Sequence, residues 1–147
     1  MKSFTGSEPL FIDTWGWLVL SNDKEINHRL VVNLHRQCLD RGGTWITTDY
    51  VLDETLTRLF AANPFSRAHQ FFEAILKSQK LGSLKVETIS PERFQAAWEL
   101  RLRYKDKPRI SFTDLTSFVV MRDVGIRHVL TGDAHFSQVG LRFQRIP

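Results

Sequence analysis

The order of short β-rich runs and longer helical stretches constrains the fold of this chain more than any other feature. The predicted strands are PLFID at 9–13, TWIT at 44–47, a run at 84–89, HVLT at 128–131 and LRFQRI at 141–146. Between them, apolar residues recur at helical spacing. Strands that alternate with helices predict an α/β fold with a mainly parallel sheet.

Boundary signals define the helices between these strands. Five helices are predicted: at about 25–41, from Thr48 to Asn63, from after Pro64 to Gly82, from Ser90 to Leu102 and from Ser111 to Gly125. A short helical turn is predicted over 133–139. Ser90-Pro91-Glu92 combines a capping hydroxyl, a first-turn proline and an acidic residue near the positive end of the helix dipole. The chain has no internal repeat or linker, and its 147 residues predict one domain spanning 1–147.

Composition excludes several classes of protein. The hydrophobic fraction of 42% supports a real core, and no apolar run reaches the roughly 18 residues of a membrane helix. The single cysteine, Cys38, excludes an internal disulfide and a cysteine-cluster zinc site. The opening MKSFTGSEPL lacks the apolar region of a secretory signal, so we expect a cytoplasmic protein.

The positive charge of the chain is concentrated in one segment. The formal net charge is +4, and the stretch RLRYKDKPR alone contributes +4. Its basic residues are Arg101, Arg103, Lys105, Lys107 and Arg109. A local basic segment is typical of phosphate contact and predicts RNA binding, although a solvated loop gives the same pattern.

Two acidic residues follow predicted strands directly. Asp13 closes PLFI, and Asp133 comes shortly after HVLT. In parallel sheets, ligands bind beyond the carboxyl ends of the strands, which is where these two carboxylates are expected. Both residues also precede helical segments, so capping of a helix is the alternative role.

Two further acids lie on predicted helices. Asp114 is the third residue after Ser111, as in a capping box, but it shares a helix face with Phe118 and Met121. A carboxylate among apolar neighbours is costly unless it is paired or binds metal, which favours a functional role. Glu54 lies nearly opposite the apolar face of its helix, so its position alone predicts an ordinary surface residue.

Carboxylates that converge repel one another and raise one another's pKa. A hard divalent cation relieves that repulsion, and Mg²⁺ or Mn²⁺ prefers oxygen ligands. Such an ion lowers the pKa of a bound water molecule and stabilises negative charge on a phosphoryl group. The acids therefore predict metal-dependent hydrolysis of a phosphodiester.

Three segments, in this order, resemble PIN-domain proteins of the VapC-like class. They are FIDTWGWLVL, TTDYVLDETLTRL and ISFTDLTSFVVMRDVGIRHVLTGDAHFSQVGLRF, and together they span nearly the whole chain. The resemblance implies a Rossmann-like fold, in which helices sandwich the sheet, and cleavage of RNA with Mg²⁺ or Mn²⁺. It matches Asp13, Glu54, Asp114 and Asp133 to the four acids of the family. Glu54 is included in the predicted site on the basis of this resemblance alone, because its position on the helix does not indicate a functional role.

The resemblance also implies roles for individual residues and partners. Asp13, Asp114 and Asp133 would bind the metal or its waters, and Glu54 would complete the shell or orient water. The supporting hydroxyls would be Thr14, Ser111 and Thr131. A homodimer is expected, as is a toxin role in which a small antitoxin protein blocks the cleft.

Two neighbouring residues keep open interpretations. Trp15 stands where the family often has a small or polar residue, so it either packs in the core or a dimer or offers a face for base stacking. His135 follows Asp133 by two residues and could contact metal, substrate or only local structure. No zinc site is predicted.

Other functions fit parts of the pattern. A solitary PIN nuclease without an antitoxin would have the same acids. A non-catalytic module that binds RNA or protein would keep the fold, although the four acids argue against it. A phosphatase of the haloacid dehalogenase type needs a second Asp two residues after the first, where Trp15 stands.

Overall fold

The computed structural model describes residues 4–147, so residues 1–3 of the expected single domain lie outside the described residues. The sheet has five strands, all parallel, in the order β3-β2-β1-β4-β5. The strands are β1 (Leu10–Ile12), β2 (Trp45–Thr48), β3 (Leu84–Glu87), β4 (His128–Leu130) and β5 (Gln144–Ile146). The helices are α1 (Thr14–Ser21), α2 (His28–Asp40), α3 (Asp49–Ala62), α4 (Phe65–Leu81), α5 (Pro91–Arg103), α6 (Phe112–Val124) and α7 (His135–Gln138).

The strand order places a switch in winding direction at the centre of the sheet. The chain moves outward from β1 through β2 to β3, and then returns to place β4 on the free side of β1. Leu10 pairs with His128 and Ile12 with Leu130, so β1 and β4 end level with each other. In such sheets, the loops after the two strands at the switch form the ligand crevice.

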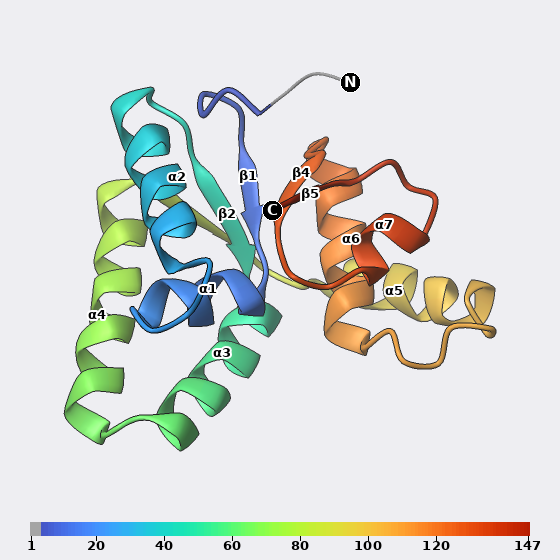
Figure 1. The fold of residues 1–147 in the computed structure, drawn as a ribbon. Helices are drawn as coiled ribbons and strands as arrows, with labels where there is room; N and C mark the ends of the chain where they lie inside the picture. Colours follow the sequence, from blue (N-terminus) through green and yellow to red (C-terminus); the bar gives the residue numbers. More distant parts are fainter. Residues whose placement is uncertain (1–3) are drawn as a thin grey trace.

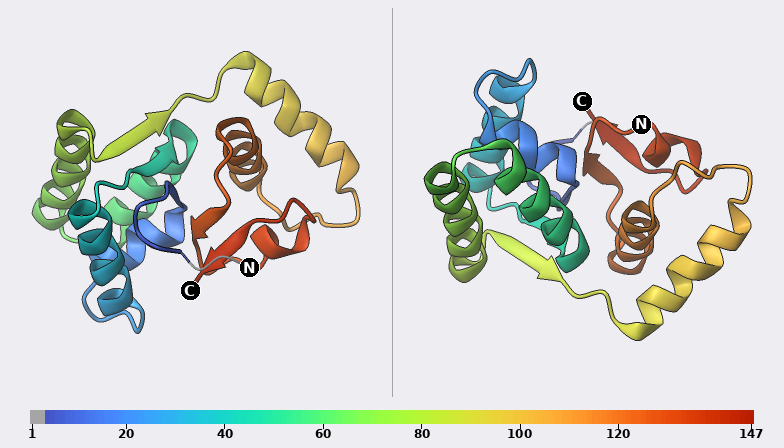
Figure 2. Two further views of the ribbon diagram at one scale, coloured as in Figure 1. Left: turned by 90° about the horizontal axis from the view of Figure 1, so that it is seen from above. Right: turned by 90° about the horizontal axis from the view of Figure 1, so that it is seen from below.

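Helices cover the sheet on both sides. The helices α1, α2 and α4 lie together on one side, and α5 and α6 lie together on the other (Figures 1 and 2). Helix α3 lies below the carboxyl ends of the strands, in contact with α1, α4 and α6 (Figure 1). This arrangement confirms the Rossmann-like α/β prediction and leaves the carboxyl edge of the sheet framed by α1, α3 and α6.

Helix α6 is the most deeply buried helix of the described chain. Every residue from Asp114 to Met121 is buried. The ring of Phe118 meets that of Phe136 edge to face, with centroids 4.8 Å apart. The segment FTDLTSFVVM has apolar residues on every side of the helix, which explains why it lies against the sheet with α5 and α7 packed against it.

The predicted boundaries agree with the structure except at a few ends. The helix predicted from residue 25 begins at His28, and Ile26, expected on its apolar face, is 97% exposed in the preceding turn. The expected last strand over 141–146 is reduced to β5, because Gly140 and Arg142 have positive φ angles that a strand does not accommodate. Among residues 4–147, none of the helices combines the length and apolarity needed to cross a bilayer.

Truncation of Phe118 tests the α6 core. Phe118→Ala should lower the free energy of unfolding by about 3–5 kcal/mol, because a fully buried ring leaves a cavity. Phe65→Ala is the matched control: Phe65 is 72% exposed, and its loss should cost less than about 1 kcal/mol. Urea denaturation followed by circular dichroism gives both values. Equal costs for the two variants would contradict this account of the core.

Candidate active site

Asp13 is held at the carboxyl end of β1. Its backbone N–H donates to the carbonyl of Leu130 at 3.2 Å, which extends the β1–β4 pairing by one residue. The hydroxyl of Thr131 donates to Asp13 Oδ2 at 2.9 Å, while Oδ1 has no hydrogen-bond partner among the described residues. Although Asp13 precedes α1, its side chain makes no capping hydrogen bond to it. Asp13 as a whole is 5% exposed, and it lines the cleft beyond the strands.

Asp114 enters the same cleft from the first turn of α6. The hydroxyl of Ser111 accepts a hydrogen bond from Asp114 N at 3.0 Å, so Ser111 caps the helix. The reverse bond of a capping box, from the Ser111 N–H to the Asp114 carboxylate, is absent from the hydrogen bonds of the described residues. The side chain instead points towards Asp133 and is buried, with 7% exposure for the residue.

Glu54 reaches the cleft from α3. The hydroxyl of Thr14 donates to Glu54 Oε2 at 3.0 Å, and Arg58 Nη1 lies 3.7 Å from Oε1. Glu54 lies on the face of α3 opposite Leu52 and Leu59, and this face is partly covered because α3 contacts α1. The surface position expected from periodicity is partly correct, since the Glu54 side chain remains 39% exposed.

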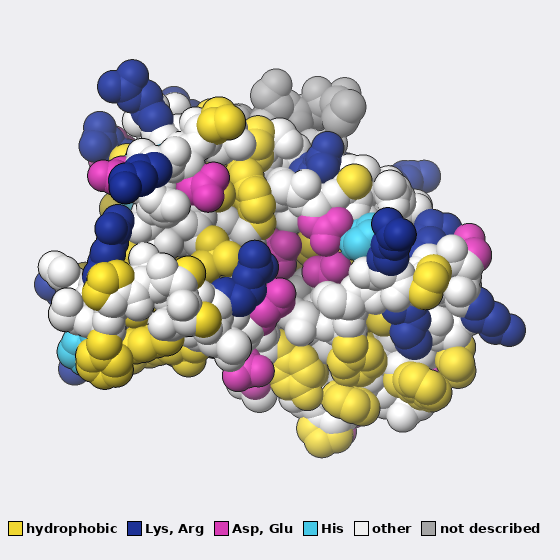
Figure 3. Space-filling view, turned by 60° about the horizontal axis from the view of Figure 1, so that its bottom comes forward, with side chains coloured by type: hydrophobic (Ala, Val, Ile, Leu, Met, Phe, Trp, Pro, Cys, Tyr) yellow, Lys and Arg dark blue, Asp and Glu magenta, His cyan; other side chains and the backbone are white. Residues whose placement is uncertain are grey.

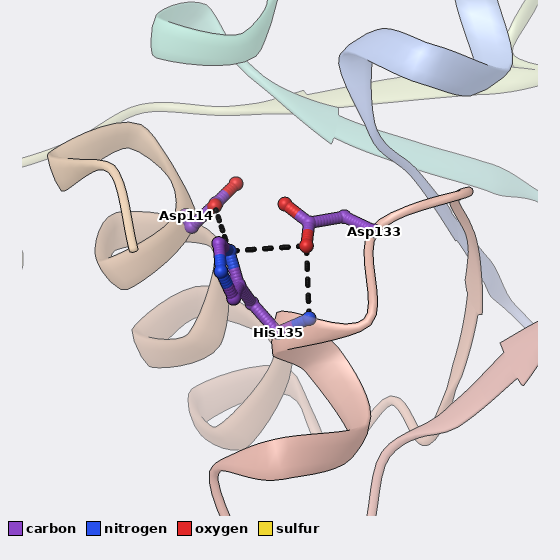
Figure 4. Close-up of side chains that lie close together, drawn as sticks. All are labelled: Asp114, Asp133 and His135. Carbon is purple, nitrogen blue, oxygen red and sulfur yellow. Dashed lines mark hydrogen bonds and ion pairs between the residues drawn. The ribbon is translucent and has the colours of Figure 1, made fainter. Parts of the chain in front are cut away.

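Asp133 lies in the loop after β4, next to His135 at the start of α7 (Figure 4). The His135 N–H donates to Asp133 Oδ1 at 2.8 Å, and Asp133 N donates to the Thr131 hydroxyl at 3.0 Å. The expected interaction with the helix start is therefore present. The ring nitrogen Nδ1 of His135 lies 3.0 Å from Asp133 Oδ1 and 3.5 Å from Asp114 Oδ2.

These elements enclose an acidic cleft of about 370 Å³. It is lined by Asp13, Thr14, Trp15, Glu54, Arg58, Arg109, Ser111, Asp114, Gly132 and Asp133. Figure 3 shows acidic side chains gathered in a hollow of this face, with a histidine beside them and basic side chains on both flanks. The structure thus brings together all four acids that the sequence singled out.

Burial and mutual repulsion raise the pKa values of two of the acids. Burial raises the pKa of Asp13 from 3.8 to about 6, and the charges of Glu54 and Asp133 add to this effect. Burial also raises the pKa of Asp114 from 3.8 to about 8, with further contributions from the charges of Asp13 and Asp133. Convergent carboxylates with raised pKa values are the electrostatic setting that a divalent cation relieves.

The residues present fit a hard divalent cation. Oδ1 of Asp13 is buried and has no hydrogen-bond partner within residues 4–147, Asp13 lines the cleft, and the carboxylates supply oxygen ligands. Asp114, Asp133 and His135 each offer a ligand atom, and these three atoms lie within 4.8 Å of one another. Carboxylate oxygens are the preferred ligands of Mg²⁺ and Mn²⁺.

Comparison with known proteins identifies the family. The sequence model of the PIN domain family matches residues 10–141, a range that includes all four acids. The chain belongs to the PIN domain family. The predicted resemblance to VapC-like PIN proteins is confirmed by the 23S rRNA-specific endonuclease VapC20 of Mycobacterium tuberculosis, which is 30% identical over 131 residues, covering 89% of this chain and 94% of VapC20.

Solved structures agree with this assignment. The crystal structure of Mycobacterium tuberculosis VapC20, described as a sarcin–ricin loop cleaving toxin, superposes with a TM-score of 0.73 at 28% identity and covers 89% of this chain and 95% of that chain. VapBC2 from Rickettsia felis, bound to a DNA fragment from its promoter, gives a TM-score of 0.69 at 14% identity and covers 93% and 98% of the two chains. The second likeness shows the PIN fold alone.

The basic segment of this PIN domain divides into two parts. Arg101 is engaged inside the protein: its guanidinium donates to the carbonyls of Ile110, Tyr104 and Lys107 at 2.6–2.7 Å. Arg101 therefore has a structural role in closing the loop between α5 and α6, and its contact with RNA stays a prediction. Arg109 lines the acidic cleft, and the other three basic residues of the segment do not.

Three contributors to this site escaped the sequence analysis or were left open by it. Arg58 follows Glu54 by one helical turn, a spacing that gives an i,i+4 ion pair and was available in the sequence. Trp15 is half-buried against Gly132, where a Cβ atom would come within 2.6 Å of the indole Nε1. His135 is the third, because only the fold shows that it faces both Asp114 and Asp133.

The raised pKa values predict a pH dependence of stability for the metal-free PIN domain. The pKa values of Asp13 and Asp114 are about 6 and about 8 in the folded protein, against 3.8 for an ordinary aspartate. The folded state therefore binds more protons than the unfolded state between about pH 4 and pH 8, and stability falls as pH rises through this range. The melting temperature in EDTA should therefore fall as pH rises from 5 to 8. Asp114→Asn should reduce this fall and raise the melting temperature at pH 8.

The matched control for this measurement is Asp53→Asn, because Asp53 is an exposed carboxylate on α3 outside the cleft. It should leave the pH profile of the melting temperature as in the parent protein. A parent profile that rises between pH 5 and pH 8 would contradict the assignment of protons to the buried acids.

Proposed function

We propose that this PIN domain is a divalent-metal-dependent endoribonuclease and the toxin of a type II toxin–antitoxin pair. The observation that carries the proposal is the convergence of four acids, one with a buried unpartnered oxygen, at the switch point of the sheet. The similarity to VapC20, whose name is that of an endonuclease, supports the same reaction class.

Each acid has a proposed role. Asp13, Asp114 and Asp133 hold the metal, and Thr131 orients Asp13 through its hydroxyl. Glu54, oriented by Thr14, lies where it can accept a proton from water or bind a water molecule of the metal. A bound Mg²⁺ or Mn²⁺ supplies a water of lowered pKa and stabilises charge on the phosphoryl group. Ser111 keeps Asp114 in place by capping α6.

Basic and aromatic side chains at the cleft suit a nucleic acid backbone. Arg58 and Arg109 line the acidic cleft and can contact the phosphates on either side of the scissile bond. The exposed Arg103 and Lys105, together with Lys107, continue the positive charge beyond Arg109. They are the proposed secondary phosphate contacts of the RNA.

Trp15 lines the cleft as well, and its half-buried indole offers a face for a base. The target is proposed to be a structured RNA, with ribosomal RNA as the first candidate because VapC20 is named for 23S rRNA.

A protein partner and a second copy of the chain complete the proposal. The similar VapBC2 structure is named for VapB and VapC together, which supports a small antitoxin protein as a partner of this chain. A homodimer is supported by an apolar stripe on α5: Phe94, Trp98 and Leu102 are each about half exposed. Helical neighbours four residues apart form one continuous face, and exposed apolar faces of this kind are typical of interfaces.

Replacement of Asp13 tests the chemistry. Asp13→Asn should lower the rate of RNA cleavage by at least about 100-fold. Removal of a residue that only orients a metal ligand lowers activity by up to about 100-fold, and removal of the ligand itself should lower it by no less. Cleavage of purified ribosomes and of a mixed RNA pool, with Mg²⁺, Mn²⁺ or EDTA, gives the rates. EDTA should abolish cleavage by the parent protein.

Asp53→Asn is again the control and should cleave at the parent rate. Full activity of Asp13→Asn in the presence of metal would overturn the proposed roles of the acids. Tight RNA binding without cleavage, with every metal, would instead support a non-catalytic binding module. Toxicity that a neighbouring short open reading frame relieves would separate a toxin from a solitary nuclease.

The stripe on α5 predicts the oligomeric state. Trp98→Glu should convert a dimer to a monomer, because it places a charge in the centre of an apolar interface. Light scattering coupled to size exclusion gives the mass, with the exposed Lys77→Glu of α4 as a charge-change control. A parent protein that is a monomer throughout would contradict the proposed homodimer.

A further inference from the structure

We propose that His135 is a metal ligand through Nδ1, and that this nitrogen makes the cleft select Mn²⁺ over Mg²⁺. The inference rests on the proposed function, because it concerns the ion held by Asp114 and Asp133. It adds a residue that lies outside the four acids and assigns a preference between the two ions.

The position of the His135 ring is the first observation. His135 is the first residue of α7 (Figure 4). Its side chain is 24% exposed, while Nδ1 itself is buried. Nδ1 faces carboxylate oxygens from two different elements, at 3.0 Å from Asp133 and 3.5 Å from Asp114. The ring therefore points its nitrogen at the space between these carboxylates.

The second observation is that Nδ1 makes no hydrogen bond with any described residue. The contact with Asp133 Oδ1 is short, but its direction does not suit a hydrogen bond, and that oxygen already accepts the backbone N–H of His135. With the ring proton on Nε2, Nδ1 presents its lone pair to an ion between the two carboxylates. Buried polar atoms without partners are rare, and a bound ion is one of the few explanations for them.

The third observation is the spacing of the ligand atoms. Atoms about 2.1 Å from an octahedral ion lie about 3 Å apart when they are adjacent and about 4.2 Å apart when they are opposite. The distances from Nδ1, 3.0 and 3.5 Å, match adjacent positions, and all three ligand atoms lie within 4.8 Å of one another. Asp13, which is almost fully buried, contributes an unpartnered oxygen to the same cleft.

The nitrogen determines which ion is favoured. Mg²⁺ prefers oxygen ligands and retains its waters, whereas imidazole is a ligand of transition metals. A set of carboxylates alone suits both ions, so the selectivity comes from the single imidazole. Replacement of that nitrogen by an oxygen should remove the preference for Mn²⁺ while leaving a site for Mg²⁺.

Electron paramagnetic resonance of Mn²⁺ tests the inference without reference to activity. Pulsed spectra of Mn²⁺ bound to the untagged protein should show a directly coordinated nitrogen-14. His135→Asn places an amide oxygen near the position of Nδ1, so it should remove the nitrogen signal and keep Mg²⁺ binding. His135→Ala should lower Mn²⁺ affinity by about tenfold or more, and Mg²⁺ affinity by less.

His69→Asn is the matched control. His69 lies on α4, 3.7 Å from Glu73 in an exposed histidine–carboxylate pair that could bind Mn²⁺ at high concentration. The nitrogen signal should survive in this variant. A signal that survives in His135→Asn and disappears in His69→Asn would overturn the inference. So would equal losses of Mn²⁺ and Mg²⁺ affinity in His135→Ala, since His135 would then only position Asp133.

Failure of the inference is distinguishable from failure of the proposed function. Mn²⁺ that binds without coordinated nitrogen, and that Asp114→Asn releases, overturns the role of His135 and leaves the metal-dependent nuclease intact. Mn²⁺ binding that Asp114→Asn leaves unchanged would show that the ion binds outside the cleft. That outcome overturns both.

Discussion

The pairing of β1 with β4 is the constraint on which the site depends. These two strands run parallel and end level, so the residues that follow them meet at one edge of the sheet. The hydrogen bond from Asp13 N to Leu130 O extends the pairing, and the Thr131 hydroxyl then fixes Asp13 across the strand boundary. Residues 118 positions apart in the chain are therefore rigidly placed. The same pairing carries Asp133 to the cleft and starts α7 beside it.

The cleft places negative charge where the protein solvates it poorly. Asp13 and Asp114 are nearly buried, and their raised pKa values express the cost of charging them there. The Thr131 hydroxyl donates to Asp13, which offsets part of that cost, and the Thr14 hydroxyl fixes the orientation of Glu54. The site is therefore destabilised but ordered in the absence of a cation. Preorganised ligands of this kind bind an ion without first having to rearrange.

Much of this arrangement could be predicted from the sequence. Apolar runs and capping residues gave strands and helices at nearly their observed positions, since Ser90 and Ser111 cap the helices they were expected to cap. The sequence already singled out Asp114, because a carboxylate on an apolar helix face is costly unless it is paired or binds metal, and the structure places it in the cleft. Glu54 depended on the family resemblance, since its contact with Thr14 joins two helices far apart in sequence. The structural role of Arg101 was not predicted, because a charge pattern does not show which carbonyl groups a guanidinium will contact.

The packing of Trp15 against Gly132 gives the cleft a built-in optical reporter. The chain has four tryptophans; Trp17 and Trp45 are buried in the core, and Trp98 lies on α5. Trp15 alone lines the acidic cleft, with its indole against a residue that has no side chain to separate them. Indole emission responds to local polarity and to nearby charge. A variant that keeps Trp15 as its sole tryptophan would report occupancy of the cleft by ion, RNA or protein through its fluorescence, without an added label.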